Sequence, residues 1–234
     1  MSSKSRILIV VTNVSHFSDP SEPTGLWLSE LTHAWDVFKE HGAEMTIISP
    51  RGGRCPLDPR SLKFPTYDKS AKAWHTNPEL MGLLETTAHA QSINPDNYDA
   101  IYFTGGHGVM FDFRESEDLQ RITREIFERG GIVSSVCHGY CGLLDTKLHD
   151  GSGVVPYNVE EDTKKRGAQY KKRWLPFMSY TVVDRNLITG QNPGSARETA
   201  LKVVTAIRGV PKRPEQNPGV DSTDKDLKDL EAKI

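Results

Sequence analysis

The chain has 234 residues, of which 36% are hydrophobic and 26% are charged, and its formal net charge is −2. This length and composition predict one globular domain with a buried core, and they exclude a disordered or fibrous protein. The near-neutral charge provides no long-range field for a nucleic acid or an anionic membrane surface, so we expect neither as a partner.

The elements predicted up to residue 136 alternate between strands and helices. The β-branched apolar run at residues 6–12 is typical of a strand buried on both faces of a parallel sheet. Further strands are predicted at residues 44–49, 99–104 and 131–136, and helices at residues 24–41, 77–88 and 117–129. This order predicts an α/β fold, with a doubly wound, mostly parallel sheet sandwiched by helices in the flavodoxin-like manner.

The chain after the fourth strand is less regular. Residues 145–173 are polar and contain glycine, and we interpret them as a lid or an inserted loop. A hairpin is predicted at residues 180–189 and a closing helix at residues 195–208. The single domain is expected to span residues 1–210, followed by a C-terminal tail at residues 211–234 that is rich in proline and charge.

The cysteine content indicates a reducing compartment. Three cysteines do not form a disulfide framework, and no CxxC pair indicates a zinc site. The first apolar stretch, at residues 7–11, is too short for a signal sequence or a membrane span. The sequence therefore predicts a cytoplasmic protein with free thiols and no bound metal.

The sharpest local pattern is Val136-Cys137-His138-Gly139, at the end of the fourth strand. A small-residue turn between a buried strand and a helix is typical of a nucleophile elbow, and the helix N-terminus is expected to lower the pKa of Cys137. Taken alone, Cys137 would be better interpreted as an inert buried residue. The adjacent His138, and Gly139 as a residue that permits a strained turn, favour a catalytic nucleophile instead.

A second pattern, Gly105-Gly106-His107-Gly108, follows the third strand. Glycines let backbone N–H groups approach a ligand closely, as an oxyanion hole requires. The same turn would also suit a plain connection or a phosphate cradle. Its pairing with the elbow of the next βα unit favours the oxyanion hole.

The acidic residues give weaker signals when only their spacing is considered. Glu30 lies outside the apolar stripe of the first helix, and this spacing indicates a solvated carboxylate. Glu160 and Glu161 lie in a hydrophilic segment and are typical of a surface loop.

These motifs resemble the PfpI superfamily, the cysteine-containing relatives of class I glutamine amidotransferase domains. Within it they are similar to the branch of glyoxalase III enzymes and holding chaperones. The resemblance extends over residues 6–208 and rests on the turn at residues 104–108, the elbow at residues 136–139, Glu30, and the segment at residues 187–195. It implies the α/β fold predicted above and a homodimer.

The resemblance also implies roles for individual side chains. Cys137 would be the nucleophile, His138 its acid/base partner, and Glu30 a carboxyl group hydrogen-bonded to the thiolate. The acid that orients the histidine in the family would be Glu161 here, with Glu160 as the alternative.

Backbone groups around these side chains would bind the substrate. The N–H groups of Gly106 and His138 would face the oxyanion, and Gly105, His107 and Gly139 would complete the site. The implied reaction converts a small 2-oxoaldehyde such as methylglyoxal to a 2-hydroxy acid, D-lactate, without a cofactor.

Two other kinds of function would use the same residues. A cysteine, a histidine and an oxyanion hole would also serve an amidase, a peptidase or a deglycase. A redox-sensing stress protein or a holding chaperone would need only an accessible thiol of low pKa. A base directly after the cysteine favours catalysis over sensing.

Overall fold

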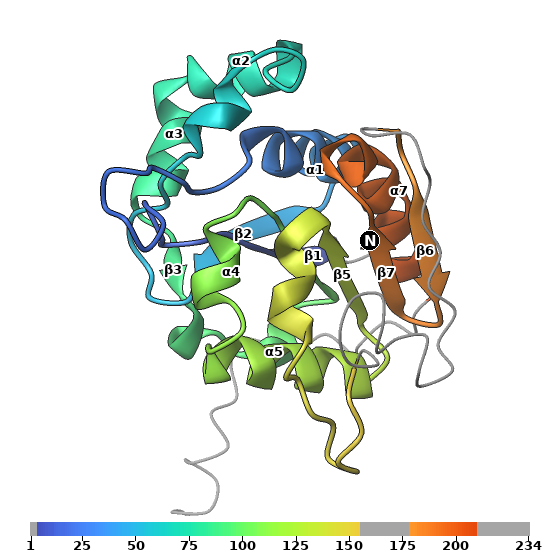
Figure 1. Ribbon diagram of the computed structural model, residues 1–234. Coiled ribbons are helices and arrows are strands. Elements are labelled where there is room, and N and C mark those ends of the chain that lie inside the picture. Colours follow the sequence, from blue (N-terminus) through green and yellow to red (C-terminus); the bar gives the residue numbers. More distant parts are fainter. Residues whose placement is uncertain (1–3, 155–177, 210–234) are drawn as a thin grey trace, which may run out of the picture.

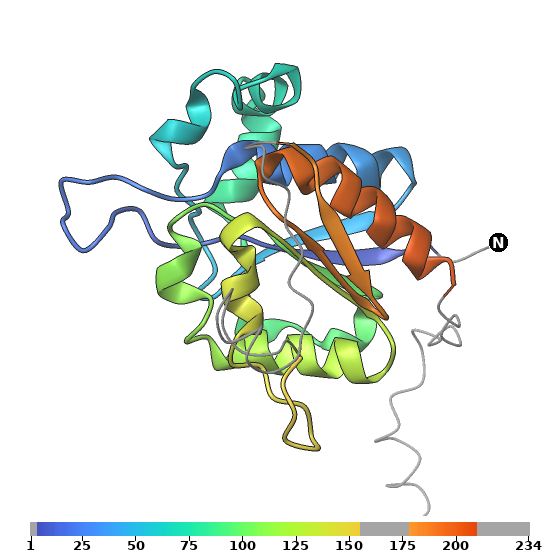
Figure 2. The same ribbon diagram turned by 45° about the vertical axis from the view of Figure 1, so that its right-hand side comes forward.

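The computed structural model in Figures 1 and 2 describes residues 4–154 and 178–209. Its strands are β1 (Arg6–Val10), β2 (Glu44–Ser49), β3 (Ala88–His89), β4 (Ala100–Phe103), β5 (Ile132–Val136), β6 (Thr181–Asp184) and β7 (Leu187–Gly190). Its α-helices are α1 (Leu28–Glu40), α2 (Lys69–His75), α3 (Pro78–Glu85), α4 (Val109–Asp112), α5 (Glu117–Glu128) and α7 (Ala196–Ile207). Short 3-10 helices are η1 (Pro59–Leu62), η2 (Ala90–Ser92), η3 (Pro95–Asn97), η4 (Cys137–Leu143) and η5 (Pro193–Ser195).

The described strands form one sheet in the order β3-β2-β1-β4-β5-β7-β6. Every neighbouring pair is parallel except β6 and β7, which form an antiparallel hairpin at one edge. The predicted α/β fold with a mostly parallel sheet is confirmed, and so is the hairpin.

Helices cover both faces of the sheet, with α1 and α7 on one face and α4 and α5 on the other (Figures 1 and 2). Strand β1 shows why the sequence requires two layers. Ile7 and Ile9 pack into the core beneath α1 and α7, whereas Leu8 and Val10 pack into the core beneath α5. All four side chains are buried, which explains the continuous apolar run that predicted a parallel strand.

Two predicted helix boundaries are wrong. The helix predicted from residue 24 begins at Leu28, because Gly25 adopts φ 154° and its backbone packs against Pro56 in an extended segment. The helix predicted to reach residue 88 ends at Glu85, because Ala88 pairs with β2 as the short strand β3. Helix α2 was not predicted from the sequence.

The β4 and β5 strands bring the two sequence motifs together. In the parallel register Phe103 lies opposite Ser135, so the chain leaves both strands at the same edge of the sheet. Strand β1 lies beside β4, with β2 on its other side, and this reversal of strand order is where open α/β sheets place their ligands. Of the predicted lid, only residues 145–154 are described; the remainder and the predicted tail lie outside the described residues.

Candidate active site

The elbow places Cys137 in a strained backbone conformation. Its φ is 53°, in the left-handed region, which costs a non-glycine residue about 1–2 kcal/mol. Gly139, expected to permit the strain, does not adopt a positive φ. A Cβ atom there would lie 2.5 Å from the carbonyl oxygen of Phe103 and 2.6 Å from that of Thr104. The glycine therefore lets η4 approach β4, while Cys137 itself carries the strain.

The glycine turn after β4 packs against the elbow. A Cβ atom on Gly105 would lie 2.6 Å from Oε2 of Glu30 and 3.0 Å from Cβ of Cys137. Gly106 adopts φ 108° and also contacts the backbone of Gly25 and Trp27 closely. Both glycines are required by close approach to neighbouring protein groups, and the predicted role of the turn as an oxyanion hole stays a prediction.

Glu30 is buried beside the thiol, so the solvated carboxylate predicted from its spacing is wrong. Its side chain has no exposed surface, and Oε2 accepts a hydrogen bond of 2.7 Å from the N–H of Gly105. Its Oε1 receives no hydrogen bond from a nitrogen or oxygen atom of the described residues. Burial raises the pKa of Glu30 to about 8, although the hydrogen bonds from Gly105 and Cys137 lower it.

The pKa of the Cys137 thiol is raised, which corrects the expectation of a pKa lowered by the helix N-terminus. Burial is the largest cause, followed by the nearby charge of Glu30. The backbone N–H groups of His138 and Gly106 face the sulfur and act in the opposite direction. Cys137 and Glu30 are adjacent, and because the pKa of each is raised, the thiol and the carboxyl group both keep their protons near neutral pH.

One histidine lies next to the thiol, and a second histidine lies next to the first. Nδ1 of His138 is 3.5 Å from Sγ of Cys137, within reach of a hydrogen bond to sulfur. Burial, and then the neighbouring His107, lower the pKa of His138, so its imidazole is neutral at pH 7 and can accept a proton. The rings of His107 and His138 are 4.9 Å apart.

The structure thus brings together Cys137, His138, Glu30, His107 and the glycines of both motifs. Glu160 and Glu161 lie outside the described residues, so the acid predicted to orient the histidine remains a prediction.

Sequence reasoning missed two residues of this neighbourhood, Asp58 and Arg60. Asp58 is fully buried and lies 3.7 Å from the ring of His107. In the sequence it precedes Pro59, which signals only the start of a short helix.

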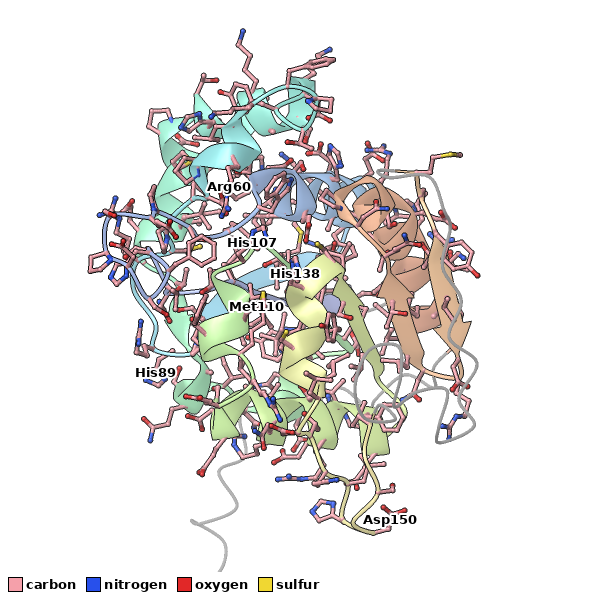
Figure 3. All side chains as sticks on the ribbon, viewed as in Figure 1. Arg60, His89, His107, Met110, His138 and Asp150 are labelled. Carbon is pink, nitrogen blue, oxygen red and sulfur yellow. The ribbon has the colours of Figure 1, made fainter. Side chains whose placement is uncertain are left out.

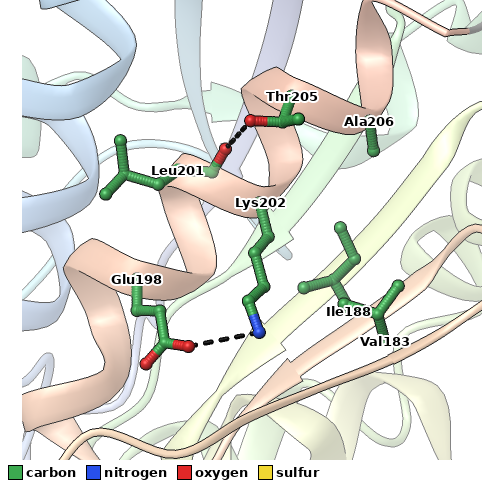
Figure 4. Close-up of a pocket in the computed structure, with 7 residues that line it drawn as sticks. All are labelled: Val183, Ile188, Glu198, Leu201, Lys202, Thr205 and Ala206. Atoms are coloured by element: carbon green, nitrogen blue, oxygen red, sulfur yellow. Dashed lines mark hydrogen bonds and ion pairs between the residues drawn. The ribbon is translucent and has the colours of Figure 1, made fainter.

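Other parts of the described chain offer less chemistry. No group of three or more histidine, cysteine, aspartate or glutamate side chains within residues 4–154 and 178–209 is arranged to hold a metal ion. None of the helices there is long and apolar enough to cross a membrane. A groove between α7 and the β6–β7 hairpin is mainly aliphatic, with one ion pair of 3.1 Å between Glu198 and Lys202 (Figure 4). It is lined by neither cysteine nor histidine.

A comparison with protein families matches the chain to the DJ-1/PfpI family over residues 24–206. The chain belongs to the DJ-1/PfpI family. The matched segment includes Glu30, the glycine turn, the elbow and all but the last residue of helix α7. The resemblance inferred from the sequence motifs is therefore confirmed.

Among DJ-1/PfpI proteins, the chain is similar to several glyoxalases. It is 28% identical to the glutathione-independent glyoxalase HSP31 of Saccharomyces cerevisiae, covering 87% of this chain and 98% of that protein. It is 26% identical to glyoxalase III of Candida albicans, whose crystal structure matches with a TM-score of 0.77 over 86% of this chain and 97% of that one. The Rapid Encystment Protein of Francisella tularensis matches with a TM-score of 0.78 at 28% identity, over 87% of this chain and 99% of that one.

Proposed function

We propose that this protein is a glutathione-independent glyoxalase that converts a 2-oxoaldehyde such as methylglyoxal to D-lactate. The observation that carries the proposal is the cluster of a strained, partly buried cysteine, a neutral histidine 3.5 Å away and a buried, protonated carboxyl group. The names of the related glyoxalases supply the substrate class.

The first step is attack of the Cys137 sulfur on the aldehyde carbon. His138 takes the thiol proton, and the oxygen that becomes negatively charged moves toward the N–H groups of Gly106 and His138. These two groups already face the sulfur in the free protein, which supports their role as oxyanion donors. His138 then gives the proton that it took from the thiol to this oxygen, so the product of the step is a neutral hemithioacetal and the imidazole is neutral again.

The second step moves a proton from the aldehyde carbon to the ketone carbon. The neutral imidazole of His138 can remove the first proton and return it to the neighbouring carbon. The result is a thioester of lactate on Cys137, which water hydrolyses. The carboxyl group of Glu30 keeps a proton beside the sulfur and stabilises a thiolate when the lactate leaves.

The same site would also suit hydrolysis of an amide or removal of an early glycation product. A redox sensor is less well supported, because burial raises the pKa of the thiol and a sensor depends on a thiolate. A small-molecule substrate, a homodimer and a cytoplasmic location remain part of the proposal.

The decisive experiment is lactate formation from methylglyoxal without glutathione, followed with an enantiomer-specific lactate dehydrogenase. Wild type should produce D-lactate, and Cys137→Ala should reduce the rate by at least about 1,000-fold because the nucleophile is lost. Cys55→Ala, which removes a different buried free thiol, is the matched control and should keep most of the activity.

Absence of lactate from wild type, while Cys137 still reacts with an alkylating probe, would exclude this substrate class. Release of ammonia or an amine from amide substrates would then indicate hydrolysis. Rapid conversion of Cys137 to a sulfinic acid by peroxide, detected by mass spectrometry, would indicate sensing.

A further inference from the structure

A second imidazole, His107, lies beside His138 and is not used by the reaction described above. It follows β4, and its ring is 4.9 Å from that of His138. Its Nδ1 is buried and has no hydrogen-bond partner among the described residues. Figure 3 shows Arg60, His107 and His138 one after another along a line that leads to the elbow.

The buried Nδ1 of His107 faces a carboxylate. Oδ2 of Asp58 is 3.7 Å away, slightly beyond a hydrogen bond, and the Asp58 side chain has no exposed surface. A small closing movement would give His107 the partner that it lacks. With Nδ1 toward Asp58, the other ring nitrogen is left for the substrate.

Asp58 is held as an anion. Burial alone would raise the pKa of Asp58, but hydrogen bonds from Arg60 and Thr24 outweigh burial, and the pKa is lowered. Arg60 donates from Nε to Oδ1 at 2.8 Å and from Nη2 to Oδ2 at 2.5 Å, and Thr24 donates at 3.1 Å. A buried, paired carboxylate of this kind is costly to build, and the oxygen that faces His107 is Oδ2, which already accepts from Arg60 and Thr24.

The isomerisation needs more proton transfers than one histidine can perform at one time. When His138 removes the proton from the aldehyde carbon, the electron pair moves toward the ketone oxygen, which must then receive a proton. The oxyanion donors Gly106 and His138 face the other oxygen. A second acid on the opposite side of the substrate would complete the step.

We propose that His107, oriented by Asp58, is a second catalytic acid and base, which protonates the ketone oxygen of the Cys137-bound hemithioacetal. His107 enters this step as an imidazolium, with one N–H toward Asp58 and the other toward the substrate. The C–H bond at the aldehyde carbon breaks toward His138, a carbon–carbon double bond forms, and the ketone oxygen takes the second of these protons from His107. The ketone carbon then takes the proton back from His138, and the first hydroxyl group returns a proton to His107. Both histidines end as they began, and no oxidant or cofactor is consumed.

This inference rests on the proposed glyoxalase activity, and the test separates the two. The experiment measures D-lactate formation and the rate of Cys137 alkylation by iodoacetamide for wild type, His107→Gln and His149→Gln. His149 is an exposed histidine next to Asp150, remote from the elbow (Figure 3), and serves as the matched control. Lactate formation by wild type and the control tests the activity itself.

His107→Gln should lower kcat about 100-fold or more with KM changed less than about threefold, because general acid catalysis contributes at this scale. Alkylation of Cys137 should stay within about twofold, because the nucleophile and His138 remain. Asp58→Asn should lower kcat less, and adding it to His107→Gln should have little further effect, because Asp58 acts through His107.

Three results would overturn the inference. The first is a kcat of His107→Gln equal to that of wild type. The second is an equal loss of kcat and of the Cys137 alkylation rate in His107→Gln, which would mean that His107 only supports the elbow. The third is absence of lactate from wild type and the His149→Gln control alike, which would refute the proposed function and the inference with it.

His107→Asn, which has a shorter amide side chain, provides an independent check on folding when its thermal unfolding matches that of wild type.

Discussion

Glu30 determines how stability depends on pH at the scale of single residues. Its pKa is raised from 4.5 to about 8 by burial, so the folded protein keeps a proton that the unfolded chain releases. The unfolded state therefore binds fewer protons between pH 4.5 and 8, and the free energy of unfolding falls as pH rises through that range. The slope from this one group is about −1.4 kcal/mol per pH unit at most.

Glu30→Gln should remove this contribution, because the amide has a similar shape and no charge. Between pH 5 and pH 8 the wild type should lose stability that the variant keeps. The variant's unfolding free energy should therefore rise relative to that of wild type by about 1–3 kcal/mol over this range. Urea denaturation at four pH values measures it. A difference that stays constant with pH would show that Glu30 is ionised in the folded protein.

Glu30 also shows where sequence reasoning reaches its limit for a side chain. Spacing along α1 describes which positions face the sheet, but Glu30 is buried by the glycine turn after β4, which approaches from outside the helix. The family resemblance located Glu30, whereas its spacing did not. Asp58 was missed for the same reason, because its neighbours Thr24 and His107 are distant in the sequence.

At the scale of elements, the contact between η4 and β4 depends on one missing side chain. A Cβ atom on Gly139 would overlap two carbonyl oxygens of the β4 end, which cannot move without disturbing the sheet. Gly139→Ala should therefore destabilise the protein by about 2–3 kcal/mol or more and displace the elbow. Thermal unfolding and Cys137 alkylation measure the two effects.

Gly82→Ala in α3 is the matched control for that substitution. No atom lies within 4 Å of a Cβ added at Gly82, and its backbone is helical. Alanine should stabilise the helix by up to about 1 kcal/mol. Equal effects at the two positions would contradict the packing role assigned to Gly139.

The elements themselves follow largely from the sequence. The apolar runs of β1, β4 and β5, which are buried on both faces, predicted the parallel sheet, and the turn before β7 predicted the hairpin. Helix ends were less predictable, because Gly25 and Ala88 are held in extended conformations by tertiary contacts with Pro56 and β2. Helix α2 escaped detection because it is short, with only Ala71 and Trp74 buried.

At the scale of the whole molecule, the fold assembles the site from segments that are far apart in the chain. Glu30 follows β1, His107 follows β4 and Cys137 follows β5, and the order of these strands in the sheet places all three at one edge. Strand order could be predicted only as a class of fold. For that reason the motifs indicated a nucleophile and an oxyanion hole, while the Asp58–His107 pair became visible only in three dimensions.

The left-handed conformation of Cys137 also limits how heat-resistant the protein can become while it remains active. Glycine tolerates this conformation and alanine does not. Cys137→Gly should therefore have an unfolding free energy about 1 kcal/mol higher than Cys137→Ala, and a higher melting temperature. Both variants should lose activity equally. Calorimetry of the two inactive variants isolates the backbone term, and equal melting temperatures would show that the turn is relaxed. For folding stability alone, glycine would suit this turn better than cysteine, so the cysteine is placed there at a cost to stability.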